Sequence, residues 1–111
     1  MSVAQLFNMP KTQAEWSYWL FSNADEHQQI IDGIKRKFSI ILDRYILDPA
    51  PQQDTQQFLL WHQIMHYEMD NVLKIGVNDY TSLNFNDPEA LEYMWWQHGN
   101  EHILARQALG I

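Results

Sequence analysis

The chain has 111 residues, a formal net charge of −7 and no cysteine. This length fits one domain with its own apolar core, and the missing cysteines exclude disulfides and thiolate metal sites, as in proteins of a reducing compartment. The acidic charge disfavours nucleic-acid binding, which depends on basic surfaces, and neither a signal peptide nor an apolar run of roughly 18 residues that could span a membrane is expected.

A long helix is predicted for residues 12–38. Thr12 is followed three residues later by Glu15, the pattern of a capping box at a helix start. Apolar side chains then recur at helical spacing as far as Phe38, on the face that we expect to be buried. The pattern fits one continuous helix or two helices with a kink near residues 22–23.

An irregular connector and a second helix follow. Pro49 and Pro51 interrupt the periodic pattern, because proline lacks the backbone donor that a helix or a strand needs. The helical pattern resumes over residues 54–75. Gly76 then predicts a left-handed residue that ends this helix.

A third helix is predicted for residues 87–108. Asp87 followed by Pro88 is typical of an N-cap with proline at the first helical position. The fold class is therefore all-α, a single domain over residues 1–111 with three main helices. From the lengths of the connecting segments we expect these helices to be antiparallel.

The histidines form the main chemical pattern. "HQIMH" and "HGNEH" each hold two histidines four residues apart, so that each pair lies on one helix face. Helical periodicity turns these faces inward, whereas Asp70 is expected on the outer side of its helix. The expected buried polar network comprises Asn23, His27, His62, His66, His98 and His102.

Three interpretations of these histidines compete. His62, His66, His98 and His102 could offer four nitrogen ligands to one metal ion. A histidine–carboxylate pair such as His102 with Glu68 could act in acid–base catalysis, but no nucleophile motif accompanies it, and an enzyme is not expected. The favoured interpretation is a hydrogen-bonded network that fixes helix register, without catalytic residues, metal or cofactor.

Other apolar residues lie off the core faces. Leu60 and Ile64 on the second helix, and Trp96 and Ile103 on the third, point away from the apolar stripes. Three helices cannot cover every side of one another, and large exposed apolar side chains often mark protein–protein contacts. These four residues are therefore predicted to form an interface.

Several motifs together resemble those of a known group of proteins. They are "ILDP", "HQIMH", "FNDPEAL" and "GNEH", with "LGI" at the end. The chain resembles small all-helical proteins encoded among the virion structural genes of tailed bacteriophages. The resemblance implies a virion structural protein of the neck, tail, head–tail connector or another ring-like assembly.

Such a protein would contact other virion proteins and copies of itself, as a homo-oligomer, but neither nucleic acid nor membrane. It would be located in the virion after assembly in the cytoplasm of the host bacterium. The alternatives are a histidine-rich metal-binding helical bundle and a phage assembly factor that is absent from the finished particle.

Overall fold

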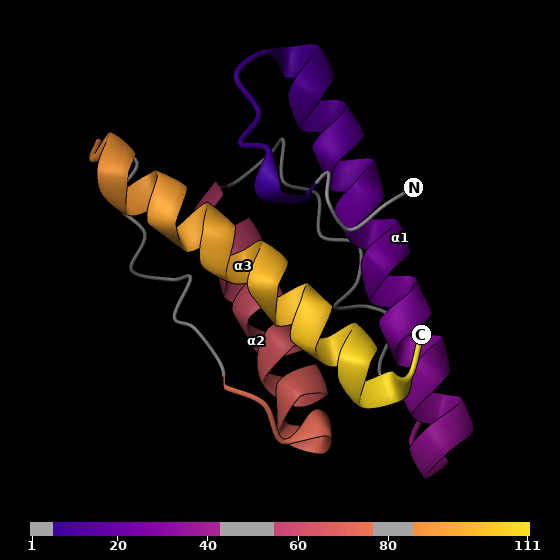
Figure 1. Ribbon diagram of the computed structural model, residues 1–111. Helices are drawn as coiled ribbons and strands as arrows, with labels where there is room; N and C mark the ends of the chain where they lie inside the picture. The colour runs from indigo at the N-terminus through magenta and orange to yellow at the C-terminus, as the bar shows by residue number, and fades with distance from the viewer. Residues whose placement is uncertain (1–5, 43–54, 77–85) are drawn as a thin grey trace.

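The fold is a bundle of three packed helices, α1 (Gln13–Phe38), α2 (Thr55–Leu73) and α3 (Pro88–Leu109) (Figure 1). The computed structural model describes residues 6–42, 55–76 and 86–111, and in α2 the side chains from His62 onward. No strand occurs in these segments, so the predicted all-α class is confirmed.

Helix α1 is continuous and capped at both ends. The Glu15 backbone N–H donates to the Thr12 hydroxyl at 3.1 Å, and this hydroxyl donates to the Glu15 carboxylate at 3.1 Å. The helix ends where Ser39 adopts the left-handed conformation, with φ at 60°. Phe38 is 41% exposed, so the prediction that it joins the buried face is wrong: it lies in the last turn of α1.

Helix α2 ends earlier than predicted. Lys74 takes the left-handed conformation, with φ at 59°, and the Ile75 N–H donates to the Asp70 carbonyl at 3.0 Å. Gly76 does not have a positive φ, so the prediction that it is the left-handed stop is wrong. The left-handed residue thus comes two positions earlier than predicted, at Lys74, where a side chain makes this conformation cost about 1 kcal/mol.

Helix α3 has the predicted N-cap and ends at Leu109, one residue later than predicted. The Asp87 side chain accepts a hydrogen bond from the Ala90 N–H at 3.3 Å, and Pro88 occupies the first helical turn. Gly110, with φ at 71°, is the left-handed cap, and its N–H reaches the carbonyls of the last turn. Local capping chemistry therefore sets both boundaries.

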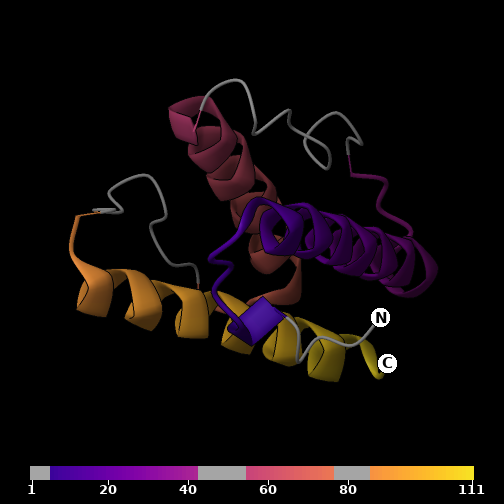
Figure 2. The ribbon, with the colours of Figure 1, turned by 90° about the horizontal axis from the view of Figure 1, so that it is seen from above.

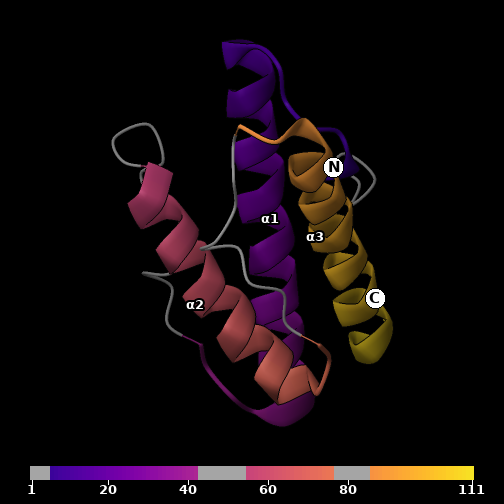
Figure 3. The ribbon, with the colours of Figure 1, turned by 90° about the vertical axis from the view of Figure 1, so that its left-hand side faces the viewer.

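The three helices run in the same direction, which corrects the predicted antiparallel arrangement. Near the start of α1, the ring of Trp19 lies 5.0 Å from that of Trp95, early in α3. At the end of α1, Lys37 Nζ donates to the carbonyl of Ala108, at the end of α3. The starts of α1 and α3 thus lie side by side, as do their ends, and α2 runs in the same direction (Figures 1 and 3).

The length of the connectors allows this topology. Residues 39–54 and 74–87 link consecutive helices. About 15 extended residues reach roughly 50 Å, which exceeds the roughly 30–40 Å length of these helices. A connector can therefore return from the end of one helix to the starting end of the next, so connector length alone did not determine direction.

The apolar core has two parts. The cluster toward the C-terminal halves of the helices contains Ile30, Ile31, Ile34, Met65, Met69, Leu73 and Ala105. The cluster toward the N-terminal end contains Leu6, Trp19 and Trp95. The histidines lie at intermediate positions along the helices, where the three helices surround a common centre (Figure 2).

Two glycines allow close packing. A Cβ atom on Gly33 of α1 would lie 2.9 Å from the Leu109 side chain, so this residue lets α3 approach α1. A Cβ atom on Gly99 of α3 would lie 2.8 Å from the ring of Phe7. The segment before α1 therefore packs directly on the α3 backbone.

Candidate metal centre

All five histidines of the chain meet inside the bundle. His27 comes from α1, His62 and His66 from α2, and His98 and His102 from α3. None of these side chains is more than 3% exposed. Every helix therefore contributes imidazole to one enclosed centre.

The rings approach one another through their Nε2 atoms. His27 Nε2 lies 3.1 Å from His66 Nε2 and 2.9 Å from His102 Nε2. His102 Nε2 also lies 3.1 Å from His98 Nε2. His62 belongs to the same group, since one ring nitrogen from each of His27, His62, His66 and His98 can be chosen so that all four lie within 4.8 Å of one another.

Protons alone cannot satisfy this arrangement. An imidazole nitrogen carries either one N–H or one lone pair, so it forms one well-directed hydrogen bond. His27 Nε2 and His102 Nε2, however, each have two other Nε2 atoms at hydrogen-bond distance. Even with alternating tautomers, the single N–H or lone pair at each of these two atoms can be directed at only one of its two neighbours, so one close contact at each atom lacks a well-directed hydrogen bond.

The same distances fit ligands that share an ion. With metal–nitrogen bonds of about 2.1 Å, two ligand atoms lie about 3.0 Å apart at a right angle and about 3.4 Å apart at the tetrahedral angle. The measured separations of 2.9–3.1 Å correspond to angles near 90°. A cation at this point would bind these nitrogens through their lone pairs, in place of close contacts that lack a well-directed hydrogen bond.

Two carboxylates lie behind His66, on the side away from the other histidines. Its Nδ1 is 3.3 Å from Glu101 Oε1 and 3.8 Å from Asp70 Oδ2. Asp70 is 1% exposed and Glu101 3% exposed. A carboxylate at Nδ1 favours a proton on that nitrogen and leaves the Nε2 lone pair for a metal, as at many metal-bound histidines.

His102 has a similar neighbour. Its Nδ1 lies 3.7 Å from Glu26 Oε1, and the other oxygen of Glu26 accepts a hydrogen bond from Arg106 at 2.9 Å. Arg106 also donates to the Gln29 side-chain oxygen at 2.9 Å. Glu26 is thereby held in place against the His102 ring.

The electrostatics divide the histidines into two kinds. Burial, followed by repulsion from neighbouring histidines, holds the pKa of His27, His62 and His98 well below the usual value near 6.5. Burial lowers the pKa of His102 to about 4, although Glu26 opposes the shift. At His66 burial also lowers the pKa, but Asp70 and Glu101 outweigh it and raise the pKa to about 9.

Asp70 is perturbed as well. Burial raises its pKa to about 7, against the effect of His66 and with that of Glu101. The prediction that Asp70 lies on the outer face of α2 is therefore wrong. Its position four residues after His66 was the signal, since residues at this spacing share a helix face.

Other carboxylates also differ from the expectation. Glu68, the predicted partner of His102, is only half-buried, and the carboxylate that faces His102 is Glu26. The sequence reasoning missed Glu26 and its ion pair with Arg106. Asn23 is buried, yet its Oδ1 accepts no hydrogen bond from any described residue.

The predicted interface residues lie apart from the centre. Ile64 is 41% exposed and Trp96 54% exposed, whereas Ile103 is half-buried. Leu60 lies outside the described side chains. Of the predicted interface residues with described side chains, the structure thus leaves Ile64 on α2 and Trp96 on α3 exposed.

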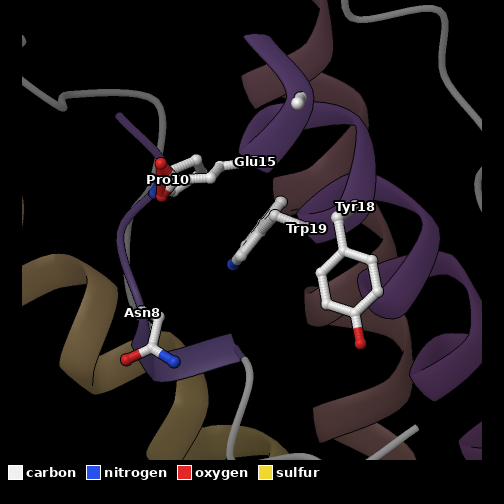
Figure 4. Close-up of a pocket in the computed structure, with 6 residues that line it drawn as sticks. Asn8, Pro10, Glu15, Tyr18 and Trp19 are labelled. Carbon is white, nitrogen blue, oxygen red and sulfur yellow. The ribbon is translucent and has the colours of Figure 1, made fainter. Parts of the chain in front are cut away.

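A surface pocket of about 380 Å³ lies beside the start of α1 (Figure 4). It is lined by Asn8, Pro10, Ala14, Glu15, Tyr18 and Trp19. Trp19 also packs against the histidine cluster, since its ring lies 5.5 Å from that of His98. This tryptophan therefore contacts both the pocket and the histidines.

No protein-family model matches the chain, and neither a curated protein nor a solved structure is detectably similar to it. Within the described helices, no segment is long and apolar enough to cross a membrane.

Proposed function

We propose that this protein binds a first-row transition-metal ion at the buried histidines, and that the ion holds the three helices together. The observation that carries the proposal is the double contact at His27 Nε2 and at His102 Nε2, of which a single N–H or lone pair can satisfy only one with a well-directed hydrogen bond. Imidazole nitrogen is a ligand suited to iron, nickel, copper and zinc. Angles near 90° favour an octahedral or square-based ion over tetrahedral zinc.

The position of the ligands supports a structural role. They come from all three helices and lie on the bundle axis, with an apolar cluster toward either end. Because the ligand set exists only in the folded chain, the binding free energy adds to the stability of the fold. A free ion at a thousand times its dissociation constant would stabilise the protein by about 4 kcal/mol.

The test is reconstitution of untagged protein. Metal is removed with a chelator, one equivalent of Fe²⁺, Ni²⁺, Cu²⁺ or Zn²⁺ is added, and bound metal and melting temperature are measured after dialysis. We expect one tightly bound ion at the histidines for at least one metal, with a rise in melting temperature. Less than a tenth of an ion per chain, with no thermal shift for any metal, would refute the proposal.

A matched pair of variants separates ligand loss from loss of stability. His27→Gln removes a central ligand and is expected to abolish binding at the histidines. Met69→Ala removes a buried side chain of the neighbouring cluster and destabilises the fold without touching a ligand. It should keep the metal stoichiometry of the unmodified chain under conditions where both variants are folded.

A role in a bacteriophage particle is the second proposal, and it is compatible with the first. Exposed Ile64 and Trp96 favour contacts with other subunits, because burying large apolar side chains drives association. Mass spectrometry of purified particles tests this role. Presence of the chain in stoichiometric amounts supports a virion component, and its absence from the particles would refute that role.

A further inference from the structure

We propose that His66 Nδ1, Asp70 and Glu101 form a second cation position, so that His66 bridges two ions. The inference rests on the proposed function, since the first ion is the one at the histidine Nε2 atoms. The second position takes a divalent transition ion such as Mn²⁺, Fe²⁺ or Zn²⁺.

The geometry of the three groups fits one ion. Ligand atoms from His66, Asp70 and Glu101 all lie within 4.8 Å of one another. The Nδ1–Oε1 separation of 3.3 Å is close to the tetrahedral value of about 3.4 Å for ligand bonds near 2.1 Å. The 3.8 Å separation to Asp70 Oδ2 corresponds to a wider angle at the same ion.

Asp70 supplies the second, independent observation. Its Oδ2 is buried, accepts no hydrogen bond from any described residue and faces His66 Nδ1 at a distance beyond hydrogen bonding. Within the described segments it pairs with no lysine or arginine, whereas Glu26 has Arg106. A buried carboxylate oxygen without a donor is costly, and coordination to a cation is one way to compensate it.

The set of donors determines the kind of ion. One imidazole nitrogen and two carboxylate oxygens form a harder site than the histidine centre, so it suits manganese, ferrous iron or zinc better than copper. Two carboxylates balance the charge of a divalent ion. When the ion binds, the proton on Nδ1 leaves to solvent, and His66 becomes an imidazolate that bonds one ion through each nitrogen.

The experiment is a stoichiometric titration with Zn²⁺ and, separately, Mn²⁺, of protein whose histidine centre already holds one equivalent of the metal that binds there in the reconstitution. The unmodified chain should then hold two ions in total. The double variant Asp70→Asn with Glu101→Gln keeps side-chain size and should bind one ion. Glu68→Gln, which removes a half-buried carboxylate from the same helix outside the site, should still bind two.

A second readout reports the bridge. In protein loaded with two Cu²⁺ ions, an imidazolate couples the two spins, so the paramagnetic resonance signal per ion falls well below that of the double variant with one Cu²⁺. Uptake of the second ion should also release the Nδ1 proton, which a pH indicator in weak buffer detects.

The outcomes separate this inference from the proposed function. If none of Fe²⁺, Ni²⁺, Cu²⁺ and Zn²⁺ binds to the unmodified chain in the reconstitution, both fail. If a single ion binds and the double variant merely binds it more weakly, the proposed function stands, but Asp70 and Glu101 act only by orienting His66. That result, or two ions in the double variant, would overturn the second position.

Discussion

The metal-free fold should be sensitive to acid, and the size of the effect follows from the buried histidines. His27, His62, His98 and His102 all have lowered pKa values, so they stay neutral in the folded protein while the unfolded chain protonates them near pH 6.5. Their contribution to stability is therefore complete above this pH and decreases as the pH falls.

Two groups act in the opposite direction. Asp70, with its pKa raised to about 7, takes up a proton in the folded state that the unfolded chain does not bind until lower pH. His66, with its pKa raised to about 9, contributes stability that is complete below pH 6.5 and is lost as the pH rises toward 9. Below pH 6.5, therefore, the loss of stability that the four histidines cause is opposed mainly by one carboxylate, that of Asp70.

Near pH 5.5 the unfolded chain therefore binds almost three more protons than the folded protein. Each proton of difference changes the free energy of unfolding by about 1.4 kcal/mol per pH unit. Because the unfolded histidines are only half protonated at pH 6.5, the expected loss between pH 6.5 and 5.5 is about 2–3 kcal/mol. For a chain of this size the melting temperature falls by about 10 °C.

The assay is a series of thermal melts, followed by circular dichroism, of metal-free protein between pH 5 and pH 9. Stability should be greatest near pH 6.5–7 and decrease on both sides. Replacing His98 and His102 together with glutamine should at least halve the acid slope. A melting temperature that is constant or rises between pH 6.5 and 5.5 would refute the reasoning, since it would mean that the histidines are already charged in the fold.

Three substitutions test the packing, each by thermal or urea denaturation. Gly99→Ala should destabilise the protein by about 1–3 kcal/mol, because the new methyl group meets the Phe7 ring, although alanine has the better helix propensity. An unchanged or raised stability would contradict this packing. Met69→Ala, at a side chain that is 1% exposed, should cost about 2–5 kcal/mol, and a loss below 1 kcal/mol would place Met69 outside the core. Arg106→Met should cost about 3 kcal/mol, because Glu26 then lies buried without its partner. Combining it with Glu26→Gln should restore part of this loss, and full additivity of the two changes would show that the residues do not interact.

The ends of the helices were largely predictable because they depend on a few neighbouring residues. Thr12 with Glu15 begins α1, and Asp87 with Pro88 begins α3, each by local hydrogen bonding. The exception is Lys74, which takes a left-handed conformation that a glycine two residues later was expected to adopt. Lysine has no local preference for that conformation, so the sequence gives no signal that α2 ends there.

The direction of the helices was not predictable from their lengths and connectors. A connector of about 15 residues reaches either the near or the far end of the next helix, so both arrangements are open. Periodicity identifies a buried face but not the neighbour that covers it. Only contacts between distant residues, such as Trp19 with Trp95, distinguish the parallel arrangement.

The candidate site was predictable in part. Helical spacing indicated that the histidines face inward, and they do, because spacing and burial depend on the same geometry. Glu26 was missed because its partner Arg106 lies on another helix, which the sequence of α1 does not reveal. Asp70 was assigned to the surface although it faces His66, four residues earlier on its own helix.

The parallel topology has a consequence for the rate of folding. In an antiparallel bundle, neighbouring helices meet through a short hairpin, but here contacts between helices join residues far apart in sequence: 39 positions separate His27 from His66, 75 separate His27 from His102, and 80 separate Glu26 from Arg106. Each contact requires closure of a long loop before it stabilises the chain, so the entropic barrier is high. Refolding should therefore be slow for a helical protein and resemble that of domains dominated by non-local contacts.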